Sequence, residues 1–236
     1  MARLVPVLDI LCGRVVRAVG GRRGEYRSLA SPLSGTADPV PTARALLAAT
    51  GATELYVADL DAITGPAPIL SPNWEVVGRL AELPATVWLD YGHRDDFDEA
   101  EALGAGVTHF VLGTETLGGV DTVYHTWAMY RDCGEVMVSL DLKAGVLQCS
   151  WATDLIDALK QAAGCFSRVL VLDVAAVGER TGPTTGPLCR RVRDAFPDVE
   201  VWTGGGIRNR DDVQRLADAG ADAVLVASAL HDGTLP

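Results

Sequence analysis

Two aspartates, Asp9 and Asp141, each end a short run of apolar residues, one near the start of the chain and one past its middle. Two carboxyl groups that face each other across a partly dry pocket can hold different pKa values, so that one accepts a proton while the other donates one. The alternative is that each carboxylate caps a loop or pairs with an arginine. We expect Asp9 and Asp141 to be a catalytic acid–base pair.

A run of three glycines, Gly204, Gly205 and Gly206, stands between an apolar run and a helix expected to begin near residue 209 or 210. The backbone N–H groups of such a run can approach an anion at the positive end of a helix. A tight turn alone would need only one or two glycines. We therefore expect a phosphate site here, completed by Ala227 and Ser228 after the last apolar run.

Two further side chains are candidates for chemistry. Lys143 lies two residues after Asp141 and is one of two lysines among 20 basic residues. It could bind phosphate, form a Schiff base with a carbonyl substrate, or lie on the surface. His93 could shuttle a proton or contact an anion. No histidines or cysteines have the spacing of metal ligands, so neither a metal nor another cofactor is expected.

These residues need elements that bring them together, and eight short apolar runs supply them. The runs are rich in Val, Leu and Ile without alternation, which is typical of parallel strands covered on both faces. They occupy residues 4–8, 54–58, 86–89, 109–112, 136–140, 168–172, 199–202 and 223–226. Helix-like segments lie between them, for example at 41–50, 95–103, 154–163, 187–196 and 211–219. This alternation indicates a closed parallel barrel or an open doubly wound sheet.

An internal repeat decides between the two. Residues 88–94 align with 202–208 at an offset of 114, and the strands ending at Asp59 and Asp173 share that offset. The strands ending at Asp9 and Asp141 align at 132. The repeat predicts one domain over residues 1–236, a (β/α)8 barrel of two half-barrels at about 1–118 and 119–236.

The two offsets differ because the first half holds 18 extra residues, which we place in a long loop at 20–41. The loop lies at the mouth of the barrel, where the carboxyl ends of all strands face one active site. At the other extreme, few residues follow the last strand, so the eighth helix should be short or missing. We expect an apolar gap there, filled by a second subunit in a homo-oligomer; a short tail across the gap is the alternative.

Composition limits the partners. The chain of 236 residues is 48% hydrophobic and 22% charged, which excludes disorder and predicts a large core. A net charge of −11 argues against nucleic acid and anionic membranes. No apolar run approaches the roughly 18–20 residues of a membrane span. Five scattered cysteines are typical of reduced thiols, and the start lacks the layout of a signal peptide, so a cytoplasmic protein is expected.

The chain resembles the histidine-biosynthesis barrels, a family that comprises phosphoribosylformimino-aminoimidazole carboxamide ribotide isomerase and the cyclase subunit of imidazole glycerol phosphate synthase. The duplicated halves and four motifs carry the resemblance: VPVLDI at 5–10, RVVRAV at 14–19, SLDLKAG at 139–145 and GGGIR at 204–208. Residues 139–141 with Trp151 downstream are more similar to the isomerase branch. The resemblance implies a cofactor-independent Amadori rearrangement of a phosphoribosyl-type aminoaldose to an aminoketose. Asp9 would be the base, Asp141 the acid, and Trp151 would cover the substrate or simply pack.

The departures from this family concern the second phosphate. The isomerases bind a phosphate at each end of the substrate, through a glycine-rich loop in each half-barrel. Here Asp90 begins DYGHR, where GGGIR is expected, although Gly113 and Thr114 keep the other part of that site. An ionised Asp90 would repel a phosphate. The loop after the sixth strand also differs, with Val-Gly-Glu at 177–179 where the family has Asp-Gly-Thr. We expect a small anionic substrate with one phosphate.

This pattern resembles the isomerase-related proteins of methanogens and methylotrophic bacteria, which are associated with methanopterin-type one-carbon cofactor pathways. The loop at 20–27 is also similar to that branch, and Arg22, Arg23 and Arg27 would hold an acidic group of the substrate or form a solvated cluster. The main expectation is an isomerase. A paralogue with an altered substrate in that metabolism, a Schiff-base lyase using Lys143 and a non-catalytic phosphate-binding subunit stay open as alternatives.

Overall fold

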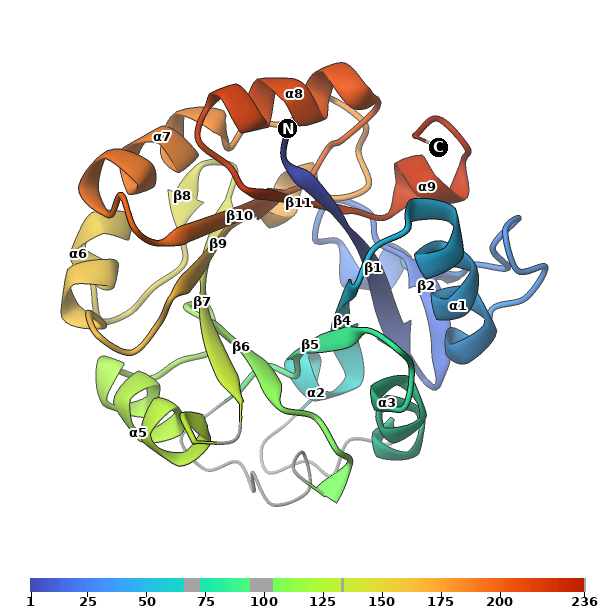
Figure 1. Ribbon diagram of the computed structural model, residues 1–236, viewed down its shortest axis with the longest axis horizontal. Helices are drawn as coiled ribbons and strands as arrows, with labels where there is room; N and C mark the ends of the chain where they lie inside the picture. Colours follow the sequence, from blue (N-terminus) through green and yellow to red (C-terminus); the bar gives the residue numbers. More distant parts are fainter. Residues whose placement is uncertain (66–72, 94–103, 133, 236) are drawn as a thin grey trace.

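The computed structural model describes residues 1–65, 73–93, 104–132 and 134–235. Eight parallel strands follow one another around a ring in sequence order, and pairing of the last with the first closes it (Figure 1). They are β1 (Arg3–Leu11), β4 (Glu54–Asp59), β5 (Thr86–Asp90), β6 (His109–Gly113), β7 (Glu135–Lys143), β9 (Arg168–Asp173), β10 (Glu200–Gly204) and β11 (Ala223–Val226). The predicted (β/α)8 barrel is confirmed, and each strand overlaps a predicted apolar run.

Helices surround the ring (Figure 1). They are α1 (Pro39–Thr50), α3 (Trp74–Ala81), α5 (Val120–Tyr130), α6 (Leu155–Gln161), α7 (Gly186–Ala195) and α8 (Arg210–Asp218). Four of the five expected helices correspond to α1, α6, α7 and α8, and the one expected at 95–103 lies outside the described residues. Local signals set the ends. Asp38 caps α1 by accepting from the Val40 N–H, and Gly51 ends it with a φ of 67°.

The interior of the ring is filled by side chains from both half-barrels. Trp88 from β5 and Trp202 from β10 occupy equivalent positions in the repeat, and their rings meet edge to face with centroids 5.5 Å apart. A second apolar layer lies between the strands and the outer helices. Together the two layers bury most of the large apolar side chains, so the inside of the barrel is a packed core.

Ion pairs close the ring at the first residues of the strands. Arg3 pairs with Glu54 at 2.6 Å and also with Glu200, while Arg168 pairs with Glu200 at 2.8 Å and with Glu135. Arg3 and Glu135 are equivalent positions in the repeat, as are Glu54 and Arg168, and each pair carries opposite charges. The two halves have therefore diverged so that oppositely charged side chains meet at the amino-terminal ends of the barrel strands.

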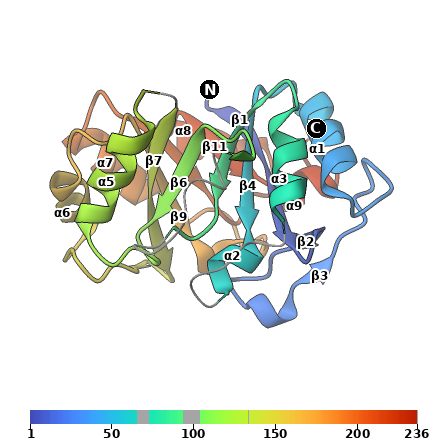
Figure 2. The ribbon, with the colours of Figure 1, turned by 90° about the horizontal axis from the view of Figure 1, so that it is seen from below.

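The extra residues of the first half form a small extension at the mouth. β1 turns through Cys12 and Gly13 into β2 (Arg14–Arg17), which pairs with β3 (Arg27–Ser28) after the short helix η1 (Arg23–Glu25). Figure 2 shows β2, β3 and α2 (Leu60–Thr64) on the side toward which the barrel strands point. The loop predicted at 20–41 is thus partly ordered, since it contains η1 and the strand β3 that pairs with β2.

The chain after β11 forms only α9 (Ser228–His231), a four-residue helix, so the expected short eighth helix is confirmed. Ala229, Leu230 and Leu235 are at most 3% exposed. His231 is hydrogen-bonded to the Ser31 hydroxyl at 2.8 Å. The expectation of an open apolar gap beside the first and last strands is therefore wrong, because the short tail fills it. The homo-oligomer stays a prediction. No helix in the described part of the chain is both long and apolar enough to cross a membrane.

Candidate active site

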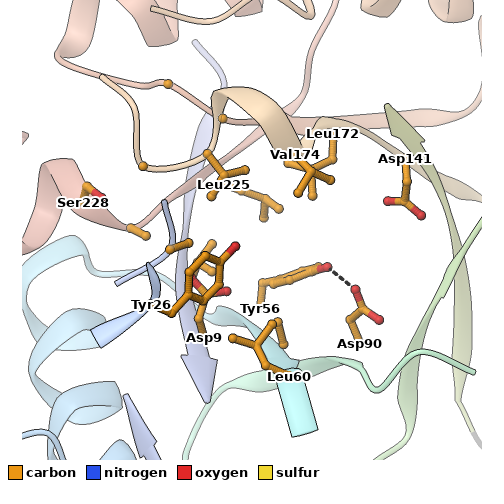
Figure 3. Close-up of a pocket in the computed structure, with 18 of the residues that line it drawn as sticks. Asp9, Tyr26, Tyr56, Leu60, Asp90, Asp141, Leu172, Val174, Leu225 and Ser228 are labelled. Carbon is orange, nitrogen blue, oxygen red and sulfur yellow. Dashed lines mark hydrogen bonds between the residues drawn. The ribbon is translucent and has the colours of Figure 1, made fainter. Parts of the chain in front are cut away.

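A cavity of about 910 Å³, measured up to its open mouth, lies at the carboxyl ends of the barrel strands (Figure 3). Its lining comes from both half-barrels. Carboxylates and tyrosines from β1, β4, β5 and β7 occupy one part, and glycines and small residues after β9, β10 and β11 occupy the other.

Three aspartates enter this cavity, namely Asp9 from β1, Asp90 from the end of β5 and Asp141 from β7. Figure 3 shows Asp9 and Asp141 on opposite sides, as the repeat predicts. Asp9 makes no side-chain hydrogen bond within the described residues, so its oxygens are available to a ligand. The structure therefore brings the predicted acid–base pair together and adds Asp90 to it.

Burial gives the three carboxyl groups raised and different pKa values. Burial, with a smaller contribution from the charge of Asp90, raises the pKa of Asp9 to about 7. Burial and the charges of Glu115 and Asp90 raise the pKa of Asp141 to about 8. Burial also raises the pKa of Asp90 to about 6, although hydrogen bonds from the Gly92 N–H and the Tyr56 hydroxyl oppose it. At neutral pH Asp141 is mostly protonated and Asp9 is near its midpoint.

Gly113 and Thr114 were expected to bind phosphate, but they lie outside the cavity lining and position Asp141. A Cβ at Gly113 would stand 2.6 Å from Asp141 Oδ2, so the glycine leaves room for this carboxyl group. The Thr114 hydroxyl accepts from the Asp141 N–H at 3.0 Å. Ser139 donates to Asp141 Oδ1 at 2.7 Å.

Two tyrosines that sequence reasoning missed line the cavity. Tyr56 from β4 donates to Asp90 Oδ2 at 2.8 Å (Figure 3). Tyr26 follows η1, is 8% exposed and points into the cavity. Burial, with the charge of Asp9 next, raises the pKa of Tyr26 to about 12, so its hydroxyl stays protonated. Tyr56 could have been found as a polar residue in an otherwise apolar strand, whereas Tyr26 lies in a loop without periodicity.

The three glycines expected to bind phosphate lie at the turn between β10 and α8, and they differ in role. Gly205 and Gly206 line the cavity with φ values of 92° and 74°. A Cβ at Gly206 would stand 2.5 Å from the Gly182 carbonyl oxygen, so only glycine fits. Gly204 is instead the last residue of β10 and packs against Leu225.

Two small residues and one arginine also line the cavity. Ala227 and Ser228 line the same side of the cavity as the glycines, as expected. Arg180, which the sequence did not single out, also lines it, has a φ of 54° and pairs with Asp232 after α9. α8 begins after Asn209, whose side chain accepts from the Asp212 N–H at 3.1 Å. The lining of the cavity thus includes two glycines of this turn, Ser228 and Arg180, groups of the kind that bind anions.

Of the three arginines expected to hold an acidic group of the substrate, Arg23 lines the cavity, and Arg22 and Arg27 do not. It pairs with Glu115 at 2.8 Å, and both residues belong to the lining. Arg22 pairs with Glu25 at 2.9 Å and with Glu179 at 2.7 Å. Arg27 donates to backbone carbonyl oxygens within the extension. Arg22 and Arg27 therefore hold loops together instead of facing a substrate.

Three further candidates do not line the cavity. Lys143 is exposed, because β7 continues to this residue and pairs with β8 (Val146–Leu147). His93 is buried between the Tyr91 hydroxyl at 2.6 Å and the Thr126 hydroxyl at 2.9 Å. Trp151 is half-buried and packs against the outer apolar layer. The sequence placed these side chains near the mouth, but their orientation depends on neighbouring elements.

Comparison with known proteins agrees with this architecture. The sequence profile described as "Histidine biosynthesis protein" matches residues 3–236. An uncharacterised protein of Methanocaldococcus jannaschii is 26% identical, covering 99% of this chain and 95% of the relative. Relatives named as isomerases of a phosphoribosylated imidazole-4-carboxamide are 33% identical in Natronomonas pharaonis, over 98% of this chain and 93% of theirs, and 31% identical in Halobacterium salinarum, over 98% and 92%. The chain belongs to the histidine biosynthesis protein family.

Proposed function

We propose that this chain is an acid–base isomerase that converts a phosphorylated aminoaldose to an aminoketose in an Amadori-type rearrangement. The observation that carries the proposal is the placement of Asp9 and Asp141 across one cavity, with the higher pKa on Asp141. Membership of a family whose named relatives are isomerases supports the same chemistry.

The two carboxyl groups keep the roles that the resemblance implies, Asp141 as acid and Asp9 as base, and their raised pKa values suit proton transfer near neutral pH. Asp141, with a pKa of about 8, donates its proton to the ring oxygen of the aminoaldose, which opens the ring to an iminium. Asp9, with a pKa of about 7, removes the proton from C2 to give an enaminol. Tautomerisation of the enaminol, with a proton delivered to C1, yields the aminoketose. These steps exchange only protons between the substrate and the protein, so the reaction is balanced without an oxidant or reductant.

The substrate of this proposal carries one phosphate, held by Gly205, Gly206 and Ser228. The opposite side of the cavity presents Asp90 and Glu115, which disfavour a second phosphate through charge repulsion. An altered substrate therefore fits better than the bisphosphorylated one of the named relatives. A role in methanopterin-type cofactor metabolism is our proposal for the pathway, supported by the resemblance of the loops to that branch.

A Schiff-base lyase and a non-catalytic subunit have less support from the site. A Schiff base at Lys143 would need this exposed lysine to enter a cavity that it does not line. A non-catalytic subunit would have no use for carboxyl groups held with raised pKa values, which reduce stability when ionised. No specific contact favours either of these two functions.

Isomerisation in D2O tests the proposal without knowledge of the natural substrate. Phosphoribosylamine, formed in solution from ribose 5-phosphate and ammonia, is incubated with the protein and followed by NMR. We expect the aminoketose with solvent deuterium at C1, and no product with Asp9→Asn. Growth rescue of a histidine auxotroph lacking the isomerase then separates the pathways. Rescue assigns the histidine pathway, turnover without rescue assigns a paralogue, and the absence of both overturns the proposal.

A further inference from the structure

The side of the cavity opposite the glycines is acidic and rich in hydrogen-bond acceptors. Asp90 and Asp141 line it together with Glu115, whose N–H is 3.3 Å from Asp141 Oδ2 and whose carboxylate is paired with Arg23 at 2.8 Å. Asp9 enters the cavity from the side opposite Asp141. Figure 3 shows Ser228 and Asp90 at opposite sides of the cavity. A ligand that spans the cavity therefore meets donors at one end and carboxylates at the other.

Asp90 lies in the first half-barrel at the position that corresponds to the start of the glycine loop in the second. It aligns with Gly204 in the repeat, and Gly92 aligns with Gly206. Gly92 has a φ of 62°, close to the 74° of Gly206, but its N–H donates to Asp90 Oδ1 at 3.1 Å. The amide that would face an anion is thus used by a carboxylate of the chain itself.

A second, independent observation points to a ligand here. Tyr26 is 8% exposed and points into the cavity, yet its hydroxyl has no hydrogen-bond partner in the described part of the chain. The hydroxyl itself opens onto the cavity, so a ligand there can bond to it. Tyr56 gives its proton to Asp90, which leaves the Tyr56 oxygen free to accept. The acidic side therefore holds unfilled polar positions.

We propose that this acidic side is a subsite for a primary ammonium group, so that the substrate is a zwitterion with a phosphate at one end and an amine at the other. The inference rests on the proposed function and names its substrate class. An ammonium group offers three donors in a compact shape, which suits carboxylates and tyrosine oxygens converging from different strands. A metal ion is less suitable, since no three acidic, histidine or cysteine side chains among the described residues are arranged to hold one.

Titration calorimetry of the whole chain with three matched ligand series tests the subsite. The probes are ω-aminoalkyl phosphates, n-alkyl phosphates and alkane bisphosphates of equal lengths. We expect the best aminoalkyl phosphate to bind roughly tenfold or more tighter than its n-alkyl match, the range of a charge-assisted hydrogen bond. Bisphosphates should bind more weakly than the amines. Because an ammonium favours ionised carboxylates, binding should also release protons, which measurements in two buffers detect.

Variants assign the preference to residues. Asp90→Asn should reduce the ratio of aminoalkyl to n-alkyl affinity to about twofold or less, and Tyr26→Phe should reduce it partly while removing one oxygen only. Asp198→Asn, an exposed carboxylate outside the cavity, should leave the ratio unchanged.

Failure of the ammonium subsite can be distinguished from failure of the proposed function. Equal affinity for amine and alkyl ends, tighter binding of bisphosphates, or a preference that survives Asp90→Asn overturns the ammonium subsite alone. If no alkyl phosphate binds, or if Gly206→Ala leaves n-alkyl phosphate affinity unchanged, the phosphate end is wrong and the proposed function fails with it.

Discussion

Glu115 controls how tightly Asp141 holds its proton. It lies at the cavity, its N–H is 3.3 Å from Asp141 Oδ2, and its charge is the largest contribution after burial to the raised pKa of Asp141. A general acid must keep its proton near neutral pH, so a neighbouring negative charge helps this carboxyl group in its proposed role. The cost is that Glu115 needs a counter-charge, which Arg23 supplies.

The proposed roles predict a bell-shaped pH dependence of kcat/KM. Activity should rise as Asp9 loses its proton near its pKa of about 7, and fall as Asp141 loses its own near about 8. Glu115→Gln removes a charge that raises the pKa of Asp141, so the falling limb should move to lower pH. Glu75→Gln, exposed on α3, is the control and should move neither limb. A falling limb that stays in place with Glu115→Gln would contradict the assignment.

Removing either carboxyl group of the pair should separate activity from stability. Asp9→Asn and Asp141→Asn should each lower kcat by roughly 10²–10⁴-fold, the usual contribution of a general acid or base. Because both folded-state pKa values are raised, folding binds protons and stability falls as pH rises from about 4 toward 8. Both variants should therefore unfold at a higher temperature than the natural chain at mildly alkaline pH. Full activity in either variant would contradict the assignment of Asp9 and Asp141 as the acid–base pair.

At the level of elements, the turn between β10 and α8 carries the proposed phosphate site. Gly206→Ala should weaken binding of inorganic phosphate and lower the free energy of unfolding, because the new Cβ would stand 2.5 Å from a carbonyl oxygen at a φ of 74°. Gly51→Ala is the matched control, with a φ of 67° and nothing within 4 Å. It should cost about 1–2 kcal/mol for the left-handed conformation alone. Phosphate titration and thermal unfolding measure both effects, and equal costs would show that the close contact is relieved.

The sequence was sufficient for the elements and for the facing aspartates. Buried parallel strands leave long apolar runs, and the repeat determined which strand ends face each other, so Asp9 and Asp141 could be placed in advance. The roles of Gly113 and Lys143 could not be predicted from the sequence, because they depend on contacts across strands. Gly113 leaves space for a carboxyl group of the next strand, and Lys143 is turned outward by the β8 pairing. Tyr26 lies in an irregular segment, where no periodicity indicates orientation.

At the scale of the whole molecule, the outer layer is completed by the short tail after β11. Leu235 is 1% exposed although it lies beyond the last helix, and its N–H donates to the Ala229 carbonyl at 3.1 Å. Leu235→Ala should lower the free energy of unfolding by about 2–4 kcal/mol, because it leaves a cavity beside the first and last strands. Leu33→Ala, at a side chain 41% exposed, should cost far less. Denaturant unfolding measures both, and similar losses would mean that the tail does not seal the barrel.

The meeting of Trp88 and Trp202 inside the ring has an optical consequence. Each half-barrel contributes one of these two rings, and their centroids are 5.5 Å apart with planes inclined at 65°. Two indoles this close and this strongly inclined share their excited states, so the far-ultraviolet circular dichroism of the folded chain should contain an excitonic couplet. The couplet exists only while the two halves are docked. It therefore gives barrel closure a spectroscopic signal of its own, separate from the helix content that ordinary dichroism reports.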